Sequence, residues 1–417
     1  MPIWRPYTAH YEGATLPPNI VRAQGAYLYA ADGRRFWDGV SAWWVTVHGH
    51  CHPYIAEAVA RQAHALDQVL FADFTHPVAE ALAQRLSEKS GLPWVFFSDD
   101  GSTAVEVALK VAIQYFRNQG SPRHRILALE GAYHGDTFGA MSVSARSAFT
   151  APFAGYLFEV EWLPFPSSEN ESALKAALST IPQREDIAAF IGEPLIQGAA
   201  GMRMYAPHYW DAIASAVRSA GGLIIADEVF TGFGRTGTLF ATEQCTEKPD
   251  IICLSKGLTG GFLPMGLTLV SEKVFEAFYS PQREKVLYHG HSYTGNAIAS
   301  AAALANLDLW ERAETWAQLR RLMEAQAMLT HQWREAYPNV PIRQLGLVLA
   351  IELPAAEKGY FAEHRHLLKA YAMERGIYLR PLGNVAYILP TLSSEAAEVE
   401  RALSLIADYL RKQALIS

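Results

Sequence analysis

The stretch Asp250-Ile-Ile-Cys-Leu-Ser-Lys256-Gly is a short apolar run that ends in a lysine, and Gly222-Leu-Ile-Ile-Ala-Asp227 upstream ends in a carboxylate. Strands that are apolar throughout, rather than alternating, indicate a sheet covered on both faces and therefore largely parallel. Open α/β sheets build their sites at the carboxyl ends of the strands. We therefore expect Asp227 and Lys256, 29 residues apart in the chain, to lie at one edge of such a sheet.

Further apolar segments alternate with helical patterns through the middle of the chain. Strands are predicted over 94–98, 125–130, 187–193, 223–227, 251–254 and 267–270, and helices over 104–115 and 209–220. This alternation predicts an α/β domain over residues 46–305. Residues 306–417 read as a smaller unit, with apolar segments at 342–353 and 376–389 and a capped helix beginning near Ser393. Residues 1–45 show no core pattern of their own, and we expect them to pack as part of the small domain.

The composition is that of an ordinary globular protein of 417 residues, half of them hydrophobic and 18% charged. The net charge of -7 argues against nucleic acid or an anionic membrane as the main partner. No apolar run reaches the roughly 18 residues of a membrane span, and the start lacks the apolar segment of a signal peptide. The three cysteines, Cys51, Cys245 and Cys253, fit a reducing cytoplasm better than a disulfide framework or a zinc site.

A strand-end lysine and a strand-end aspartate are the pair that a pyridoxal phosphate enzyme needs. The lysine forms a Schiff base with the cofactor, and the aspartate keeps the pyridine nitrogen protonated so that the ring accepts electrons. The alternative for Lys256 is a solvated turn residue. Its apolar flanks argue against that alternative, because a desolvated lysine has the lowered pKa that a nucleophilic amine requires.

Several other segments fit the same cofactor, although each has a plain structural alternative. Gly101 and Ser102 follow a strand and open a helix, where backbone N–H groups and hydroxyls suit a phosphate or form a simple cap. Tyr133 ends another strand and could stack on a flat ring or only pack in a turn. Glu193 could serve the site or an ion pair. Ser292 could donate to a phosphate or lie in a turn.

The segment His48-Gly-His50-Cys-His52 has the appearance of a metal cluster, but Gly49 and Pro53 favour a turn. No carboxylate or further cysteine accompanies it at ligand spacing, so we expect no metal site. No Gly-x-Gly-x-x-Gly opens a helix after the first strand, which argues against a nicotinamide enzyme.

Taken together, these segments resemble the class III pyridoxal phosphate aminotransferases over nearly the whole chain. The resemblance rests on Asp100-Gly-Ser, Tyr133-His-Gly, Gly192-Glu-Pro, Ile225-Ala-Asp-Glu-Val-Phe-Thr-Gly-Phe-Gly-Arg-Thr-Gly and Leu254-Ser-Lys-Gly-Leu-Thr-Gly-Gly. It implies the α/β architecture of fold type I, with a mainly parallel seven-stranded sheet in the large domain and a smaller α+β domain. It also implies a cytoplasmic homodimer with active sites at the interface.

Within the family, the chain is similar to members that convert 8-amino-7-oxononanoate to 7,8-diaminononanoate in biotin synthesis. Ile3-Trp-Arg-Pro-Tyr7, the pair Trp43-Trp44, Arg235 and Arg380 carry this similarity. The amino donor in that group is usually S-adenosylmethionine, and some members use lysine.

The resemblance implies a role for each matching residue. Lys256, Asp227 and Tyr133 are the expected catalytic residues; Gly101, Ser102, Glu193 and the neighbouring subunit's Ser292 complete the cofactor site; Tyr7, Trp43, Trp44, Asp136, Arg235, Gly290 and Arg380 form the substrate site. Arg380 is expected to meet the substrate carboxylate, and Arg235 with Asp136 to shape donor selectivity.

Three departures from the family pattern leave the amino donor open. Asp100 stands where many relatives have serine, Ser292 replaces a common threonine, and Arg5 replaces a common histidine. The alternatives are a lysine-dependent enzyme, an ω-amino acid:pyruvate aminotransferase or a semialdehyde aminomutase. A binding protein that has lost the cofactor is the alternative outside the enzymes.

Overall fold

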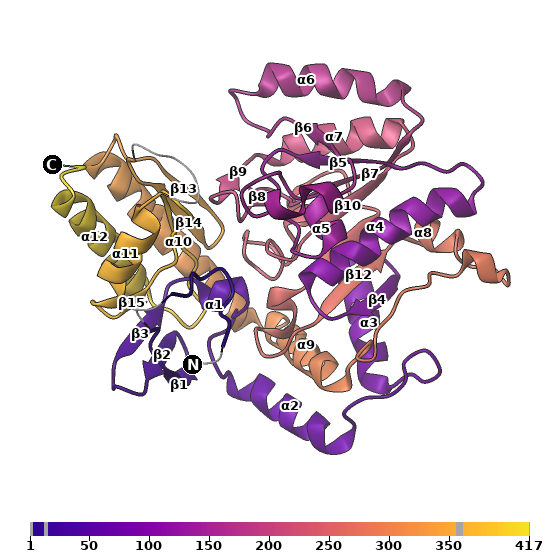
Figure 1. Ribbon diagram of the computed structural model, residues 1–417. Helices are drawn as coiled ribbons and strands as arrows, with labels where there is room; N and C mark the ends of the chain where they lie inside the picture. The colour runs from indigo at the N-terminus through magenta and orange to yellow at the C-terminus, as the bar shows by residue number, and fades with distance from the viewer. Residues whose placement is uncertain (1–2, 12–15, 356–361, 417) are drawn as a thin grey trace.

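A seven-stranded sheet forms the centre of the larger of two lobes in the computed structural model, which describes residues 3–11, 16–355 and 362–416 (Figure 1). Its strands, in spatial order, are β4 (Trp94–Ser98), β12 (Gly266–Val270), β11 (Ile251–Leu254), β10 (Leu223–Asp227), β7 (Ile187–Gly192), β5 (Arg125–Leu129) and β6 (Glu161–Leu163). The strands from β11 to β6 run parallel, and β12 is antiparallel to both of its neighbours. The predicted α/β class and mainly parallel sheet are confirmed.

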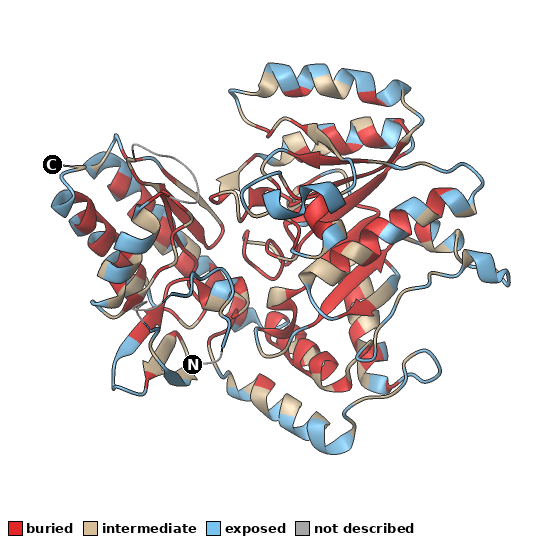
Figure 2. Ribbon diagram, viewed as in Figure 1, coloured by how far each residue is buried: buried red, intermediate tan, exposed pale blue. Residues whose placement is uncertain are grey.

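Both faces of this sheet are buried, as Figure 2 shows by the colour of its central strands. Side chains alternate along each strand. On β10, Leu223 and Ile225 pack in the cluster formed with helix α4 (Gly101–Asn118), whereas Ile224 and Ala226 pack with α7 (Pro207–Ser219). A strand covered by helices on both faces has no polar side, which explains the wholly apolar strand sequences.

The remaining helices cover the edges of the large lobe and build the small one. They are α1 (Ser41–Trp44), α2 (Pro53–Ala65), α3 (Pro77–Ser90), α5 (Phe138–Ser142), α6 (Glu171–Thr180), α8 (Glu272–Glu276), α9 (Ala297–Trp310), α10 (Ala313–Ala336), α11 (His364–Met373) and α12 (Ala396–Lys412). Short 3-10 turns span Ala151–Tyr156, Ile181–Gln183, Ala241–Gln244, Lys256–Thr259 and Arg283–Lys285. Helix α9 is mostly apolar and packs against α2, α3 and the turn that begins at Lys256.

The small lobe joins the two ends of the chain. Strands β1 (Ile20–Gln24), β2 (Tyr27–Ala30) and β3 (Arg35–Asp38) form a sheet with β15 (Ile377–Tyr378). A second sheet contains β13 (Ile342–Leu345), β14 (Val348–Glu352) and β16 (Val385–Ile388), and a two-stranded ribbon of β8 (Ile196–Gln197) and β9 (Arg203–Met204) lies in the large lobe. The amino-terminal strands therefore add directly to carboxyl-terminal structure.

Each of the two apolar segments predicted in the small unit, 342–353 and 376–389, contains two strands rather than one. The first segment breaks at Gly346, whose φ is +56° and where a Cβ atom would lie 2.3 Å from the backbone oxygen of Arg235. The second breaks between β15 and β16 at Gly383, which also has a positive φ. Left-handed backbone is the conformation that glycine adopts most readily, so both breaks fall where the chain can turn sharply.

No helix in the described part of the chain combines the length with the apolar character that a membrane span requires.

Candidate active site

The register of the sheet places three charged residues side by side. Gly192 on β7 is opposite Ala226 on β10, so that Glu193 and Asp227 leave the sheet together. Asp227 is in turn opposite Cys253 on β11, three residues before Lys256. All three strands are parallel, so their carboxyl ends meet at the same edge. The structure therefore brings together Glu193, Asp227 and Lys256, as the sequence predicted for strand ends of one sheet.

Asp227 is buried and held from two directions. Its Oδ2 lies 2.6 Å from Nδ1 of His134, and its Oδ1 accepts a hydrogen bond of 3.0 Å from the backbone N–H of Val229. His134 is itself buried, and its backbone N–H donates to Ser144 Oγ at 2.8 Å. A carboxylate held by these two contacts keeps one orientation at the strand end. No role for His134 was predicted from the sequence, although it lies directly beside Tyr133.

Glu193 is buried beside this pair. Its two carboxyl oxygens accept hydrogen bonds from the backbone N–H groups of Tyr133 at 3.2 Å and Gly198 at 2.9 Å. Burial raises the pKa of Glu193 to about 7, because His134 and the two backbone donors offset the cost of burying the charge only in part. Glu193 thus has a pKa near neutrality, and its charge acts on the Lys256 amine.

The raised pKa predicts a pH-dependent stability difference between the cofactor-free protein and its Glu193→Gln variant. Between about pH 4.5 and 7 the folded protein keeps the proton that the unfolded chain has lost. The stabilisation due to Glu193 is therefore full below pH 4.5 and declines as the pH rises through 7, by about 3 kcal/mol in total. Urea unfolding of both proteins from pH 4 to 8 measures this change. The exposed Glu276→Gln serves as the control, and a difference between wild type and Glu193→Gln that does not vary with pH would contradict the prediction.

Lys256 is half-buried at the start of a 3-10 turn directly beyond β11. Its Nζ lies 4.8 Å from the ring centre of Trp44 and 5.9 Å from that of Phe230. Burial lowers the pKa of Lys256, whereas Asp227 and Glu193 act in the opposite direction. A lysine amine in such an aromatic setting is deprotonated more readily than one in water, as an attacking amine must be.

The start of α4 forms a cradle for an anion next to these residues. Asp100 caps the helix, since its Oδ1 accepts from the N–H of Thr103 at 2.8 Å. The first N–H groups of a helix have no partner within it, which leaves those of Gly101 and Ser102 for a ligand. Gly135 passes so close that a Cβ atom there would lie 2.2 Å from Ser102 Oγ. Asp100, which departs from the family pattern, thus serves as the helix cap.

A chain of contacts leads from this cradle to the protein surface. Ser102 Oγ accepts a hydrogen bond of 3.2 Å from the backbone N–H of Asp136, and the Tyr7 hydroxyl donates to the Asp136 carboxylate. The Tyr7 ring meets the Trp43 ring edge-on at 5.6 Å, and the Arg380 guanidinium lies 4.4 Å from the centre of the Trp43 ring. Asp136 of the large lobe therefore forms one continuous surface with Tyr7, Trp43 and Arg380. We call this surface the wall, and it ends in the Arg380 cation.

Tyr133 lies between the wall and the strand ends. Its backbone is tied to Glu193, and its side chain is half-buried. Burial raises the pKa of Tyr133, and Tyr7 and Asp136 raise it further, so the phenol stays protonated at neutral pH. A neutral aromatic ring at this position can cover a flat ligand held at Asp227.

The Trp43-Trp44 pair lies in a left-handed turn. Ser41, Ala42, Trp43 and Trp44 have φ values of 49°, 49°, 64° and 75°. Such a conformation costs roughly 1–2 kcal/mol per non-glycine residue, so the surroundings must enforce it. Asp38 accepts from the backbone N–H groups of Val40 and Ala42 at 3.1 and 2.6 Å, and the Ser41 hydroxyl donates to the backbone oxygen of Leu389 at 2.7 Å. The turn points Trp44 at Lys256 and leaves Trp43 beside Arg380.

Arg235, predicted to take part in substrate binding, lies behind this turn. Its side chain is 1% exposed, and its Nη2 donates to the backbone oxygens of Trp44 and Thr46, both at 2.9 Å. Burial lowers the pKa of Arg235 to about 10, and Asp38 opposes the shift. Arg235 therefore holds the backbone of the turn that carries Trp43 and Trp44.

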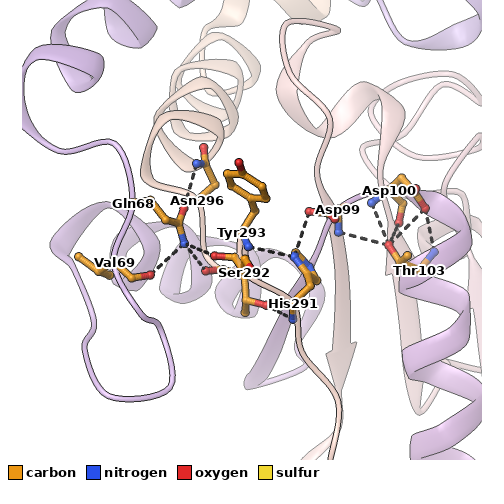
Figure 3. Close-up of polar contacts among 10 residues, drawn as sticks. Gln68, Val69, Asp99, Asp100, Thr103, His291, Ser292, Tyr293 and Asn296 are labelled. Carbon is orange, nitrogen blue, oxygen red and sulfur yellow. Dashed lines mark hydrogen bonds and ion pairs between the residues drawn. The ribbon is translucent and has the colours of Figure 1, made fainter.

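Ser292 and Gly290, also predicted for the site, lie on an exposed loop. Among the described residues, no hydrogen bond joins this loop to the Ser102 cradle of the same chain. Figure 3 shows the loop fastened to the large lobe. Gln68 Nε2 donates to the backbone oxygens of Ser292 at 3.3 Å and Thr294 at 3.1 Å, and His291 Nδ1 lies 3.3 Å from Asp99 Oδ1. The Ser292 hydroxyl is thus held on the surface.

The histidine-rich segment 48–52 makes structural hydrogen bonds. His48 Nε2 bonds to Asn306 Oδ1 at 2.9 Å, and His50 Nε2 bonds to Asp38 Oδ2 at 2.8 Å. Across the part of the chain that the structure describes, no group of three His, Cys, Asp or Glu side chains is arranged to hold a metal ion.

Comparison with known proteins identifies the family. The family model described as Aminotransferase class-III matches residues 7–410. A protein of Synechococcus elongatus named adenosylmethionine-8-amino-7-oxononanoate aminotransferase is 46% identical, with 98% of each chain covered. The crystal structure of an enzyme of that name from Methanocaldococcus jannaschii has a TM-score of 0.91 and 33% identity over 98% of this chain and 97% of its own. A PLP-bound amine transaminase from an uncultivated Pseudomonas species has a TM-score of 0.89 and 30% identity, with 98% of each chain covered.

The chain belongs to the class III aminotransferases, as its motifs indicated.

Proposed function

We propose that this class III aminotransferase transfers an amino group to the ketone of 8-amino-7-oxononanoate, giving the 7,8-diamine of biotin synthesis, with S-adenosylmethionine as the donor. The observation that carries the proposal is the wall of Asp136, Tyr7, Trp43 and Arg380, in which aromatic rings end in a guanidinium. A linear apolar acid with a terminal carboxylate fits such a wall. The similarity to adenosylmethionine-8-amino-7-oxononanoate aminotransferases supports the same substrate.

Pyridoxal phosphate is the cofactor, and the residues at the sheet edge fit it. When bound, its pyridine ring accepts electrons from the substrate carbon. Asp227 would hold the proton of the ring nitrogen, and Gly101 and Ser102 would bind the phosphate at the start of α4. Tyr133 would cover the ring of the cofactor. Glu193, whose pKa lies near 7, would change the charge next to that ring when it gains or loses its proton. The Lys256 amine would hold the aldehyde carbon and move the proton to and from the substrate carbon.

The carboxylate end of the substrate would meet Arg380, and this predicts the effect of Arg380→Met. Loss of charge-assisted hydrogen bonds costs about 1.5–3 kcal/mol, which raises KM for 8-amino-7-oxononanoate by about 10- to 150-fold. The methyl ester of the substrate lacks the negative charge that Arg380 would bind, so its KM should barely change. Steady-state kinetics with acid and ester measure both effects. Arg375→Met is a matched control, because Arg375 also lies over an aromatic ring, 3.6 Å from Tyr371, outside the wall. An equal loss with acid and ester would refute the role of Arg380.

Single half-reactions test the function itself. The enzyme is first converted to its amine form and separated from the donor, and its spectrum is then followed after adding 8-amino-7-oxononanoate or pyruvate. Return of the original spectrum with the oxononanoate supports the proposal. Return with pyruvate alone would identify an ω-aminotransferase instead. In the forward direction, S-adenosylmethionine and lysine are compared as donors, and conversion by lysine alone would replace the proposed donor while leaving the acceptor intact.

A homodimer with shared sites is also part of the proposal. The loop that carries Gly290 and Ser292 lies on the surface beside the exposed side chains of Leu70, Phe74 and Tyr293, which are 61%, 63% and 65% exposed. A second copy packed on this surface would bury the apolar side chains and bring the partner's Ser292 to the phosphate. Light scattering should give twice the mass of one chain, and a monomer that is fully active would contradict the shared site.

A further inference from the structure

The turn that carries Lys256 departs from ordinary backbone geometry. Lys256 has a φ of 45°, in the left-handed region, and it is the first residue of the 3-10 turn Lys256–Thr259. A lysine in this region is strained by roughly 1 kcal/mol, and such strain persists only where neighbouring groups enforce it. The position of the Lys256 amine therefore depends on whatever holds the next peptides of the turn.

Asn306 on α9 holds those peptides. The side-chain Nδ2 of Asn306 donates to the backbone oxygens of Gly257 at 3.0 Å and Leu258 at 2.9 Å. Backbone oxygens only accept hydrogen bonds, so this contact fixes the amide orientation and turns Oδ1 the other way. Asn306 is completely buried, which means that no water competes for these bonds.

His48 completes the arrangement. Its Nε2 lies 2.9 Å from Asn306 Oδ1, and because that oxygen accepts, the proton of the ring must lie on Nε2. Burial lowers the pKa of His48 to about 3, so the ring is neutral at physiological pH. Both hydrogens of the Asn306 amide and its oxygen are thus used, and a buried polar group satisfied in full specifies one geometry.

We propose, on the basis of the proposed function, that Asn306 held by His48 is a positioning residue that aims the Lys256 amine at its reaction partner. Asn306 contacts the backbone of the Lys256 turn and acts through it. We predict that kcat falls while KM stays the same. A misaimed amine slows proton transfer, whereas the wall that binds the substrates is unchanged. Small misplacements of a reacting group cost about 10²-fold in rate.

The variant Asn306→Leu keeps the volume of the side chain and removes its hydrogen bonds. We expect kcat to fall by about 10- to 100-fold with both KM values nearly unchanged. Asn118→Leu is the matched control, because Asn118 Nδ2 also bridges two backbone oxygens, those of Ala277 and Lys285, at 3.2 and 3.1 Å, far along the chain from Lys256. Its kcat should match that of wild type. Equal kcat values for the wild type and Asn306→Leu would overturn the proposal.

A readout that does not depend on turnover separates positioning from general destabilisation. In the cofactor-free protein, trace labelling with acetic anhydride followed by peptide mass spectrometry gives the reactivity of Lys256 against pH. We expect Asn306→Leu to move this profile and Asn118→Leu to leave it in place. Unchanged Lys256 reactivity in Asn306→Leu would overturn the proposal.

Chemical rescue provides the second test. In Lys256→Ala, methylamine is supplied as a free base, so the aim of the lysine no longer matters. Adding Asn306→Leu should then lower the rescued rate no further, and a loss as large as in the wild-type background would show that Asn306 acts elsewhere.

Should Asn306→Leu fail to fold, His48→Leu and His48→Gln replace it, with Gln expected to restore activity because its amide can donate to Asn306. Failure of His48→Gln to exceed His48→Leu would then overturn the proposal. All assays use whichever ketone the enzyme accepts, so a wrong substrate assignment leaves these outcomes readable.

Discussion

Lys256→Ala should abolish detectable transamination, because loss of its proton transfer alone lowers kcat by about 10²- to 10⁴-fold and the covalent link to the cofactor is lost as well. The variant loses the amine that would hold the cofactor aldehyde and move the proton, and no other lysine or arginine among the described residues lies over the Trp44 ring. The fold should persist, because the backbone of the turn is held by Asn306 and the neighbouring strand is buried on both faces. Single-turnover absorbance measures the loss, and circular dichroism checks the fold.

Borohydride provides the covalent evidence for the same residue. The coloured wild-type protein should be bleached and its cofactor fixed to the peptide that contains Lys256, whereas Lys256→Ala should release the cofactor on denaturation. Lys175→Ala, a change at a lysine whose side chain is 74% exposed, should behave as wild type. Full activity of Lys256→Ala, or a wild-type protein that never becomes coloured with added cofactor, would favour a binding protein over an enzyme.

Asp227→Asn should lower kcat by about 10²- to 10³-fold, the range seen when one preorganised electrostatic group is removed. An amide cannot hold the proton of the ring nitrogen by charge, and its N–H would face His134 Nδ1, which the carboxylate now contacts at 2.6 Å. The absorbance of the bound cofactor should change together with the rate, because both depend on the protonation of the ring.

Asp250→Asn is the matched control for this change. Asp250 is also buried, next to the same strand, and its carboxylate accepts from the backbone N–H of Ile224 at 2.9 Å. Its replacement should lower stability and leave the spectrum of the cofactor unaltered. If Asp227→Asn keeps the wild-type rate and spectrum, the assignment of Asp227 to the ring nitrogen is wrong.

The sheet and its strand-end residues were predictable because the signals are local. A strand buried on both faces must be apolar along its length, and a charged residue at its end marks the edge of the sheet. Asp227, Glu193 and Lys256 each follow such a strand, so their neighbourhood was predicted before any distance was known. Gly101 and Ser102 were found in the same way, from a strand that is followed by a helix start.

Other parts of the site depend on contacts between segments far apart in the chain. His134 supports Asp227 across 93 residues, and Asn306 supports the Lys256 turn across about 50 residues. Neither has a local pattern that distinguishes it from an ordinary polar residue. The signal for His134 was its place beside Tyr133, whereas Asn306 lies in a mostly apolar helix, where a polar residue could have suggested a buried partner.

The sequence by itself determined the sheet, the cofactor and the family, because these follow from apolar periodicity and from motifs whose residues are close neighbours in the chain. Only the tertiary structure decided how the site is shaped. The turn at Ser41–Trp44 adopts left-handed backbone that its own residues disfavour, and Asp38, Arg235 and the backbone of Leu389 hold it there. Arg235 therefore lies behind the wall and Arg380 at its end, because long-range hydrogen bonds outweigh the local conformational preference of the chain.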